Sequence, residues 1–409
     1  MAAFDPDLLG EPDRLLEGDP SQMLRALATA GAQVRRALTT TREAGALDLR
    51  IERPRAIVVA AMGADDVVAD LLAPLAARHS PIGVWPCHDS PLPGWVGSLD
   101  LVVAVSLSGR APGPVRLALE AGRRGASVLT IGAPDSPLAE AAARGRGVHV
   151  PAEGTGATSR SAAWSMLTPA ILALGALGVL PVDATDLDAV ADRLDEIAEA
   201  NRPTAEAFVS PAKILATGLG ATIPLVLADG PLTGVAARRA GTMLARTARL
   251  PVMVGELPDA ASQLLACLDG PYAAAPAPEG GRDIFADPYL DGPPGAEVGL
   301  LLLRDRDPRA GEEGGRVRGG EAAAYDADAP RVEIGPQDAA RINLAQGIVD
   351  LAERRGARVQ QLSPGPGGDL VRLAELMATL DFAATYLALA HGLDPATVPA
   401  LADLRDLTG

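Results

Sequence analysis

The sequence has few of the residues on which several common protein classes depend: its 409 residues include one lysine, two cysteines and only 3% aromatic residues. Cys87 and Cys267 are far apart and form no C-x-x-C pair, and the four histidines show no metal-ligand spacing. We therefore expect no disulfide framework and no metal site. Because large rings are scarce, the cores must be built from Ala, Leu and Val, which favours helices packed closely on a parallel sheet.

The sequence also lacks a net positive charge and a pattern that would predict a leader segment. The formal net charge of -16 argues against a nucleic-acid or anionic-membrane partner, because phosphate groups favour clustered Lys and Arg. Residues 1–19 are acidic and contain no charged segment followed by an apolar one, so we expect no signal peptide. The longest apolar stretch, 166–182, is interrupted by Gly175 and Gly178 and is too short to span a bilayer. These features predict a soluble, cytoplasmic protein.

The glycine fingerprint of dinucleotide-binding proteins is absent. The pair Gly218-Leu219-Gly220 precedes its predicted strand, whereas the fingerprint follows a strand and opens a helix. We therefore expect no nucleotide cofactor, and no other cofactor is indicated.

What the sequence does contain is a repeated alternation of short apolar runs and helical segments, in a length that fits two α/β domains. Continuous apolar runs are typical of strands buried on both faces of a parallel sheet. The predicted strands lie at 56–61, 82–86, 101–106, 127–131 and 147–150, and again at 223–228, 251–254, 299–303 and 358–362. We predict an α/β fold with two doubly wound, flavodoxin-like parallel sheets in tandem, joined by helices at 161–177 and 186–200.

The same pattern predicts how the chain is divided. We expect an N-terminal helical segment at 1–50, a first domain at 51–155, linking helices at 156–206, a second domain at 207–369, and a crossing helix with a tail at 370–409. Two segments rich in Gly, Pro and acidic residues, 271–297 and 305–330, interrupt the second domain. Both are typical of mobile surface loops, and we favour tolerated insertions over a lid or a partner-binding loop.

The segment Ser106-Leu107-Ser108-Gly109 lies between a predicted central strand and the helix that follows it. Ligands of open α/β sheets bind beyond the carboxyl ends of the strands, where a helix N-terminus favours an anion. Two hydroxyls and a glycine at this place suit a phosphate. A serine turn that caps the helix explains the same residues. The turn alone does not separate these interpretations.

This turn is similar to the Ser-x-Ser-Gly-x-Thr phosphate loop of sugar-isomerase (SIS) domains, and the chain resembles the bifunctional phosphoglucose/phosphomannose isomerase family, including its C-terminal SIS half. The segments that carry the resemblance are Ala61-Met62-Gly63, Ser159-Arg160-Ser161-Ala162-Ala163, Gly230-Pro231-Leu232, Gly255-Glu256-Leu257, Leu301-Leu302-Leu303-Arg304-Asp305 and Tyr386-Leu387-Ala388-Leu389-Ala390-His391-Gly392-Leu393-Asp394-Pro395. The resemblance implies two SIS domains, a sugar-phosphate ligand, a homodimer and proton transfer between C1 and C2 of an open-chain sugar.

At several positions the chain departs from the family pattern. The family's base is a glutamate in Asn-Glu-Asn, and the nearest match here is Ala245-Arg246-Thr247. Its ring-opening histidine lies in Pro-Glu-Leu-Asn-His, which reads Glu256-Leu257-Pro258-Asp259-Ala260 here. The family's C-terminal lysine falls on Arg405, and the threonine of the phosphate loop becomes Ala111. The resemblance therefore implies a scaffold from which the base and the histidine are missing.

The resemblance also implies roles for the residues that remain. Arg160 would stabilise developing negative charge, and we favour this role over a surface salt bridge. Glu256 would serve as a displaced base and Arg405 as the remaining cation, although a polar residue at a strand end is the favoured interpretation of Glu256. The phosphate would lie among Gly63, Asp65, Ser106, Ser108, Gly109 and Arg110.

Asp65 stands where the family has a serine, so its carboxylate would face the phosphate if the family geometry holds. Like charges within about 4 to 6 Å repel strongly, and Arg110 is the nearest candidate for a compensating cation. We favour N-capping and dipole compensation as the role of Asp65 and Asp66.

The leading hypothesis is a sugar-phosphate-binding SIS protein with weak or lost aldose-ketose isomerase activity. One alternative is an active isomerase that converts glucose 6-phosphate or mannose 6-phosphate to fructose 6-phosphate with Glu256, Arg160 and Arg405. The other is a non-catalytic regulatory or scaffolding protein.

Overall fold

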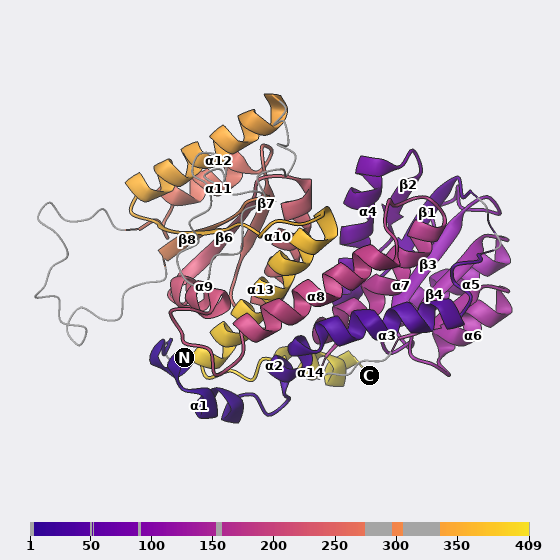
Figure 1. The fold of residues 1–409 in the computed structure, drawn as a ribbon, viewed down its shortest axis with the longest axis horizontal. Helices are drawn as coiled ribbons and strands as arrows, with labels where there is room; N and C mark the ends of the chain where they lie inside the picture. The colour runs from indigo at the N-terminus through magenta and orange to yellow at the C-terminus, as the bar shows by residue number, and fades with distance from the viewer. Residues whose placement is uncertain are drawn as a thin grey trace, which may run out of the picture.

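The computed structural model describes residues 4–49, 51, 53–88, 91–152, 158–274, 297–305 and 336–408, and it contains two parallel sheets with a layer of helices between them (Figure 1). We call the sheet of β1 to β5 with its helices the first lobe. The sheet of β6 to β9 with its helices is the second lobe. The predicted α/β fold with two tandem parallel sheets is confirmed.

The first lobe has the strand order β2-β1-β3-β4-β5, with all neighbours parallel. Its strands are β1 (Ala56–Ala60), β2 (Gly83–Pro86), β3 (Leu101–Ser106), β4 (Ser127–Gly132) and β5 (Val148–Pro151). Side chains alternate between two faces. Val58, Val102 and Val128 pack with the helices α5 (Pro112–Arg123) and α6 (Pro137–Arg144). Val59 and Val103 face the opposite side and join the large central core.

The second lobe repeats this arrangement with one strand fewer, in the order β7-β6-β8-β9. Its strands are β6 (Thr222–Ala228), β7 (Met253–Glu256), β8 (Glu297–Leu303) and β9 (Arg358–Leu362). Leu225, Leu227 and Leu300 pack with α11 (Ala261–Ala266) and α12 (Pro336–Arg354) on the outer face. The inner face contacts α9 (Pro211–Leu219) and α10 (Pro231–Arg246), on which α13 (Asp369–Ala390) packs in turn, so this sheet is also covered on both sides.

Helices between the sheets give the two lobes one continuous core. This layer consists of α2 (Met23–Ala28), α3 (Ala30–Glu43), α4 (Val67–His79), α7 (Ala163–Ala176), α8 (Ala184–Ala200), α10 and α13. Contacts run from α7 to α3, from α3 to α8, from α8 to α13 and from α13 to α10. Figure 1 shows α8 between α3, which lies along the first lobe, and α13, which lies along the second. Because the layer is shared, the two lobes pack directly against each other and are not separate domains joined only by a linker.

Of the helices in the described part of the chain, α13 is the one whose length and composition would suit a membrane span, but 89% of its apolar window is buried inside the fold. Its neighbours α8, α9 and α10 surround it. We therefore assign α13 as the core helix of the molecule. The short helices α1 (Pro12–Glu17) and α14 (Pro399–Thr408) lie near the two ends of the chain.

Each predicted strand is found, with ends that differ by at most a few residues. The helix α1 lies in the N-terminal segment predicted to be helical, whereas α9 and α14 were not predicted from the sequence. The segments 271–297 and 305–330 lie almost entirely outside the described residues. We propose 51–155 and 207–369 as the two SIS domains, because each range contains one complete sheet.

Candidate functional site

The Ser106–Gly109 turn leaves β3 at the carboxyl end of the first sheet and leads into α5. Ser106 is buried and Ser108 is exposed, and their Oγ atoms are 3.5 Å apart. The Ala111 N–H donates to Ser106 Oγ at 3.4 Å, and the Arg110 N–H donates to Ser108 Oγ at 3.3 Å. These lengths are beyond the usual range for hydrogen bonds to oxygen, so the hydroxyls hold the helix start only weakly. Both interpretations of the turn remain compatible with this geometry.

Gly109 is required by the shape of the turn. Its φ of 64° lies in the left-handed region, and its N–H donates to Ser106 O at 2.8 Å. A Cβ at this position would lie 2.1 Å from Ser136 Oγ in the adjacent loop. Glycine is the residue that satisfies both restrictions without strain.

Asp65 reaches across to this turn. Its Oδ2 accepts the N–H of Leu107 at 3.2 Å, while Oδ1 has no hydrogen-bond partner in the described part of the chain. The side chain is buried, and burial raises the pKa of Asp65 from 3.8 to about 6. The N-capping part of the favoured role is wrong for this residue, because Met62 holds the N-cap position of the short 3-10 helix Gly63–Asp66. Asp65 does lie in the first turn of that helix, where dipole compensation places an acidic residue. Asp66 holds the N-cap position of α4 but makes no capping hydrogen bond.

Buried arginines lie near Asp65 and its 3-10 helix. Arg239 on α10 makes a buried two-point ion pair with Asp381 on α13, with Nε and Nη2 donating at 2.9 and 2.8 Å. Arg160 is also buried, and its Nη2 donates to the carbonyls of Pro395 and Ala396 at 2.9 and 3.1 Å. Burial, together with Arg246, Arg239 and Arg249, lowers the pKa of Arg160 to about 10. One carboxylate, Asp381, therefore faces several guanidinium groups.

Arg246 connects the second lobe to the turn of the first. It lies at the end of α10, and its positive charge lowers both the pKa of Asp65 and the pKa of Arg160. This residue occupies the segment where the family resemblance implies the catalytic glutamate. The structure thus brings that segment close to Asp65, but with a cation in place of a carboxylate.

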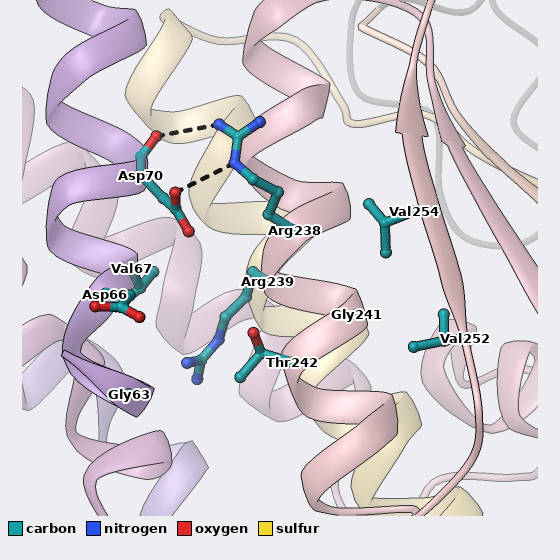
Figure 2. Close-up of a pocket in the computed structure, with 10 residues that line it drawn as sticks. All are labelled: Gly63, Asp66, Val67, Asp70, Arg238, Arg239, Gly241, Thr242, Val252 and Val254. Carbon is teal, nitrogen blue, oxygen red and sulfur yellow. Dashed lines mark hydrogen bonds and ion pairs between the residues drawn. The ribbon is translucent and has the colours of Figure 1, made fainter. Parts of the chain in front are cut away.

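A pocket of about 320 Å³ lies between α4, α10 and β7 (Figure 2). Asp70 and Arg238 close one end, with Arg238 Nε 3.3 Å from Asp70 Oδ1 and Nη2 donating to Asp70 O at 3.3 Å. Figure 2 shows the Arg239 side chain extending from α10 toward Gly63. The lining residues are Gly63, Asp66, Val67, Asp70, Arg238, Arg239, Gly241, Thr242, Val252 and Val254.

The predicted site residues do not all converge. The structure brings together Gly63, Asp65, Ser106, Ser108 and Gly109, and the helical turn of Arg160 packs against that of Asp65. Arg110 is exposed to solvent.

The two other predicted catalytic residues lie apart from the turn. Glu256 ends β7 in the second lobe, with Oε2 3.9 Å from Arg238 Nη1 and its side chain 38% exposed. Arg405 belongs to α14, but its side chain lies outside the described residues. The catalytic roles of Glu256, Arg160 and Arg405 stay predictions.

Several residues of this region were missed by the sequence analysis, namely Asp70, Arg238, Arg239, Arg249 and Asp381. The sequence held a signal for Arg238 and Arg239, which lie next to each other in the middle of an otherwise apolar helix. Arginines in such a place are costly to bury unless they are paired. Within the described ranges, no group of three His, Cys, Asp or Glu side chains has the arrangement of a metal site.

Two doubly wound parallel sheets that share a helical layer, with a serine-rich turn after β3, define the class: this is a tandem SIS-fold protein. Residues 208–407, almost half of the chain, match the family of the bacterial phospho-glucose isomerase C-terminal SIS domain. The C-terminal half of the chain is therefore similar to the SIS domain of bacterial phospho-glucose isomerases, as the sequence resemblance predicted.

Solved structures share this fold over nearly the whole chain. A candidate phosphosugar isomerase from Silicibacter pomeroyi is 21% identical, with a TM-score of 0.58, and the match covers 92% of this chain and 99% of that one. A hypothetical protein from Thermus thermophilus is 15% identical, with a TM-score of 0.62 and coverages of 98% and 94%. The tagatose-6-phosphate ketose/aldose isomerase from Escherichia coli is 13% identical, with a TM-score of 0.56 and coverages of 92% and 93%. No curated protein matches the sequence significantly.

Proposed function

We propose that this protein binds a sugar phosphate or a related anionic metabolite at the Ser106–Gly109 turn and has lost, or nearly lost, aldose-ketose isomerase activity. The observation that carries the proposal is the position of Arg246. This residue lies in the segment where the resemblance implies the base, and its charge lowers the pKa of both Asp65 and Arg160. A guanidinium stays protonated in proteins and accepts no proton from a sugar carbon. It does attract an anion.

The anion-binding side of the proposal rests on the turn and its surroundings. The turn precedes α5, a 12-residue helix whose N-terminal dipole favours negative charge. The Ser106 and Ser108 hydroxyls form only long hydrogen bonds, so they are able to rotate toward a ligand oxygen. Arg246 and Arg160 supply positive charge near Asp65, which contacts the turn, in a protein whose net charge of -16 otherwise repels anions.

The loss of isomerisation follows from where the carboxylates lie. Enolisation needs a base within hydrogen-bond reach of the substrate carbon. Glu256 faces Arg238 in the second lobe, and Asp65 is bonded to the backbone of the proposed phosphate turn. Neither position corresponds to that of the expected glutamate.

Isothermal titration calorimetry with fructose 6-phosphate, followed by a coupled isomerase assay on the same preparation, tests this proposal. We expect saturable binding, turnover far below ordinary enzymatic rates, and at least a tenfold loss of affinity in Arg246→Ala, as is typical when a charged hydrogen bond of about 1.5–3 kcal/mol is removed. Arg144→Ala is the matched control, because its guanidinium pairs with Glu140 on the exposed face of α6.

Two results would contradict parts of the proposal. Conversion of fructose 6-phosphate at ordinary rates, abolished by Arg160→Ala, would show an active isomerase, and loss of that turnover in Glu256→Gln would identify the displaced base. Absence of any binding or thermal stabilisation by sugar phosphates at millimolar concentration would favour a scaffolding role, because a ligand at a hundred times its Kd adds about 2.7 kcal/mol to the free energy of unfolding.

The homodimer that the resemblance implies, and the cytoplasmic location expected from the composition, also belong to this proposal. Phe208, Val209 and Ile214 are large apolar side chains that stay exposed near the start of α9, which supports an assembly. Light scattering after size-exclusion chromatography should give twice the monomer mass of 41.7 kDa. A monomer at micromolar concentration would contradict it.

A further inference from the structure

Asp65 contacts the turn at which we place the anionic ligand in the proposed function. Its Oδ2 already takes the Leu107 N–H, one of the backbone donors of the turn, and its Oδ1 is buried with no partner among the described residues. Ser106 and Ser108 lie on the same loop as Leu107. The carboxylate thus uses part of the hydrogen-bonding capacity that makes the turn suited to an anion.

Charged groups reach Asp65 from each neighbouring element. Asp66 follows Asp65 in the same 3-10 helix, and its Oδ1 lies 3.3 Å from His88 Nδ1. From α10 come Arg239, which is paired with Asp381, and Arg246. From the adjacent 3-10 helix Ser159–Ala162 comes Arg160, whose Nη2 is bound to carbonyls near the C-terminus. Within the described ranges, Arg246 makes no hydrogen bond or ion pair with another side chain.

A second anion in this space faces a carboxylate that cannot move into solvent, because Asp65 is 9% exposed. Repulsion between two anions at about 4 to 6 Å is large in a poorly solvated site. One proton on Asp65 removes this repulsion, and it turns an acceptor into a donor for the ligand. Burial has already raised the pKa of Asp65 to about 6, which brings protonation within reach of neutral pH.

We propose that the Asp65 carboxylate competes with an anionic ligand for the Ser106–Gly109 turn. The ligand then binds there only when Asp65 takes up a proton from solvent. This inference rests on the proposed function. It adds a specificity-determining residue to the site: Asp65 makes binding of a sugar phosphate dependent on pH and disfavours it under alkaline conditions.

The test uses glucose 6-sulfate as the probe, because a sulfate monoester keeps one charge across the pH range, whereas a phosphate has its own second pKa of about 6. Calorimetric titrations in two buffers of different ionisation enthalpy give the number of protons taken up on binding. At about pH 8 we expect the intact protein to take up about one proton, and its Kd to rise about tenfold per pH unit above the pKa.

Asp65→Asn should bind glucose 6-sulfate with no proton uptake and with a Kd that does not depend on pH. At about pH 8, two units above the pKa of the carboxyl, its affinity should exceed that of the intact protein about a hundredfold. Asp66→Asn is the matched control: it removes the neighbouring carboxylate, which contacts His88, and should still take up about one proton.

The outcomes separate this inference from the function on which it rests. If the intact protein binds the probe with no proton uptake, the role of Asp65 is overturned and the binding function stands. If neither the intact protein nor Asp65→Asn binds glucose 6-sulfate or fructose 6-phosphate at any pH, the proposed function itself fails. Binding by Asp65→Asn alone supports the inference, because the carboxylate then excludes the anion. Proton uptake by the intact protein needs no variant, so the test holds even if Asp65→Asn does not fold.

Discussion

Asp65 affects the stability of the fold at the scale of a single residue. Burial raises its pKa from 3.8 to about 6, so the folded state binds this proton more tightly than the unfolded chain. The stabilising contribution is therefore complete below about pH 4 and is lost as the pH rises through about 6. A shift of about two units corresponds to about 3 kcal/mol.

Asp65→Asn, which resembles the protonated acid, should therefore raise the free energy of unfolding by about 2–3 kcal/mol at about pH 8, in the absence of ligand. At about pH 4 the difference should nearly vanish. Urea unfolding of both proteins across this range measures it. An equal difference at both pH values would show that the effect does not come from ionisation.

Gly109 offers a second test at the residue scale. Gly109→Ala places a methyl group in a left-handed conformation and within 2.1 Å of Ser136 Oγ, whereas Gly178→Ala has a similar φ of 67° and no atom within 4 Å. We expect Gly178→Ala to cost about 1–2 kcal/mol and Gly109→Ala clearly more. Thermal unfolding of both variants makes the comparison, and Gly109→Ala combined with Ser136→Gly should recover the excess. Equal costs for the two alanines would show that the contact with Ser136 has no role.

The sequence predicted the place of the serine turn because a strand, a turn and a helix follow one another directly there. It did not predict the partner of Asp65. The Leu107 N–H is 42 positions away along the chain, and the two meet only because β1 and β3 are neighbours in the sheet. A capping role was the natural local interpretation of an acidic residue at a helix start. In the structure, Asp65 accepts the hydrogen bond from the Leu107 N–H instead of capping a helix.

At the scale of elements, the pair of Arg239 and Asp381 joins α10 to α13 in the central helical layer. Its side chains are 1% and 10% exposed. Removing one partner leaves a buried charge uncompensated, and we expect Asp381→Leu to cost about 3–5 kcal/mol.

The double variant Arg239→Met, Asp381→Leu should recover much of that loss, because apolar residues of similar volume often replace a buried ion pair at little cost. Chemical unfolding of Arg239→Met, Asp381→Leu and the double variant, compared with the intact protein, completes this double-mutant cycle. Additive costs would contradict a direct pairing.

The helix α9 was missed for a physical reason. It is short, it starts at a proline and it ends beside Gly220, so its sequence has the features of a turn. Its start is fixed by Ser210 and Asn201, whose side chains accept the N–H groups of Lys213 and Ala212. Burial against α13 then stabilises it. The long helix α13 was predicted because its signal, a long apolar segment, lies in its own sequence and needs no capping residues from elsewhere in the chain.

At the scale of the whole molecule, the alternation of apolar runs predicted both sheets, because strands buried on both faces leave a continuous signal in the sequence. The way in which the lobes face each other was not predicted. It depends on contacts such as that between Arg238 on α10 and Asp70 on α4, which join residues 168 positions apart. The approach of Arg246 to Asp65 has the same origin. The site is therefore a property of the assembled lobes.

The central claim, binding of a sugar phosphate without isomerisation, is tested most directly by proton NMR of fructose 6-phosphate with the protein in D₂O. Isomerisation through an enediol exchanges the C1 protons of the sugar with solvent, whereas binding alone broadens its resonances. We predict broadened resonances, no loss of the C1 proton signal, and no glucose 6-phosphate or mannose 6-phosphate. Rapid exchange at C1, or spectra identical with and without the protein, would contradict the account.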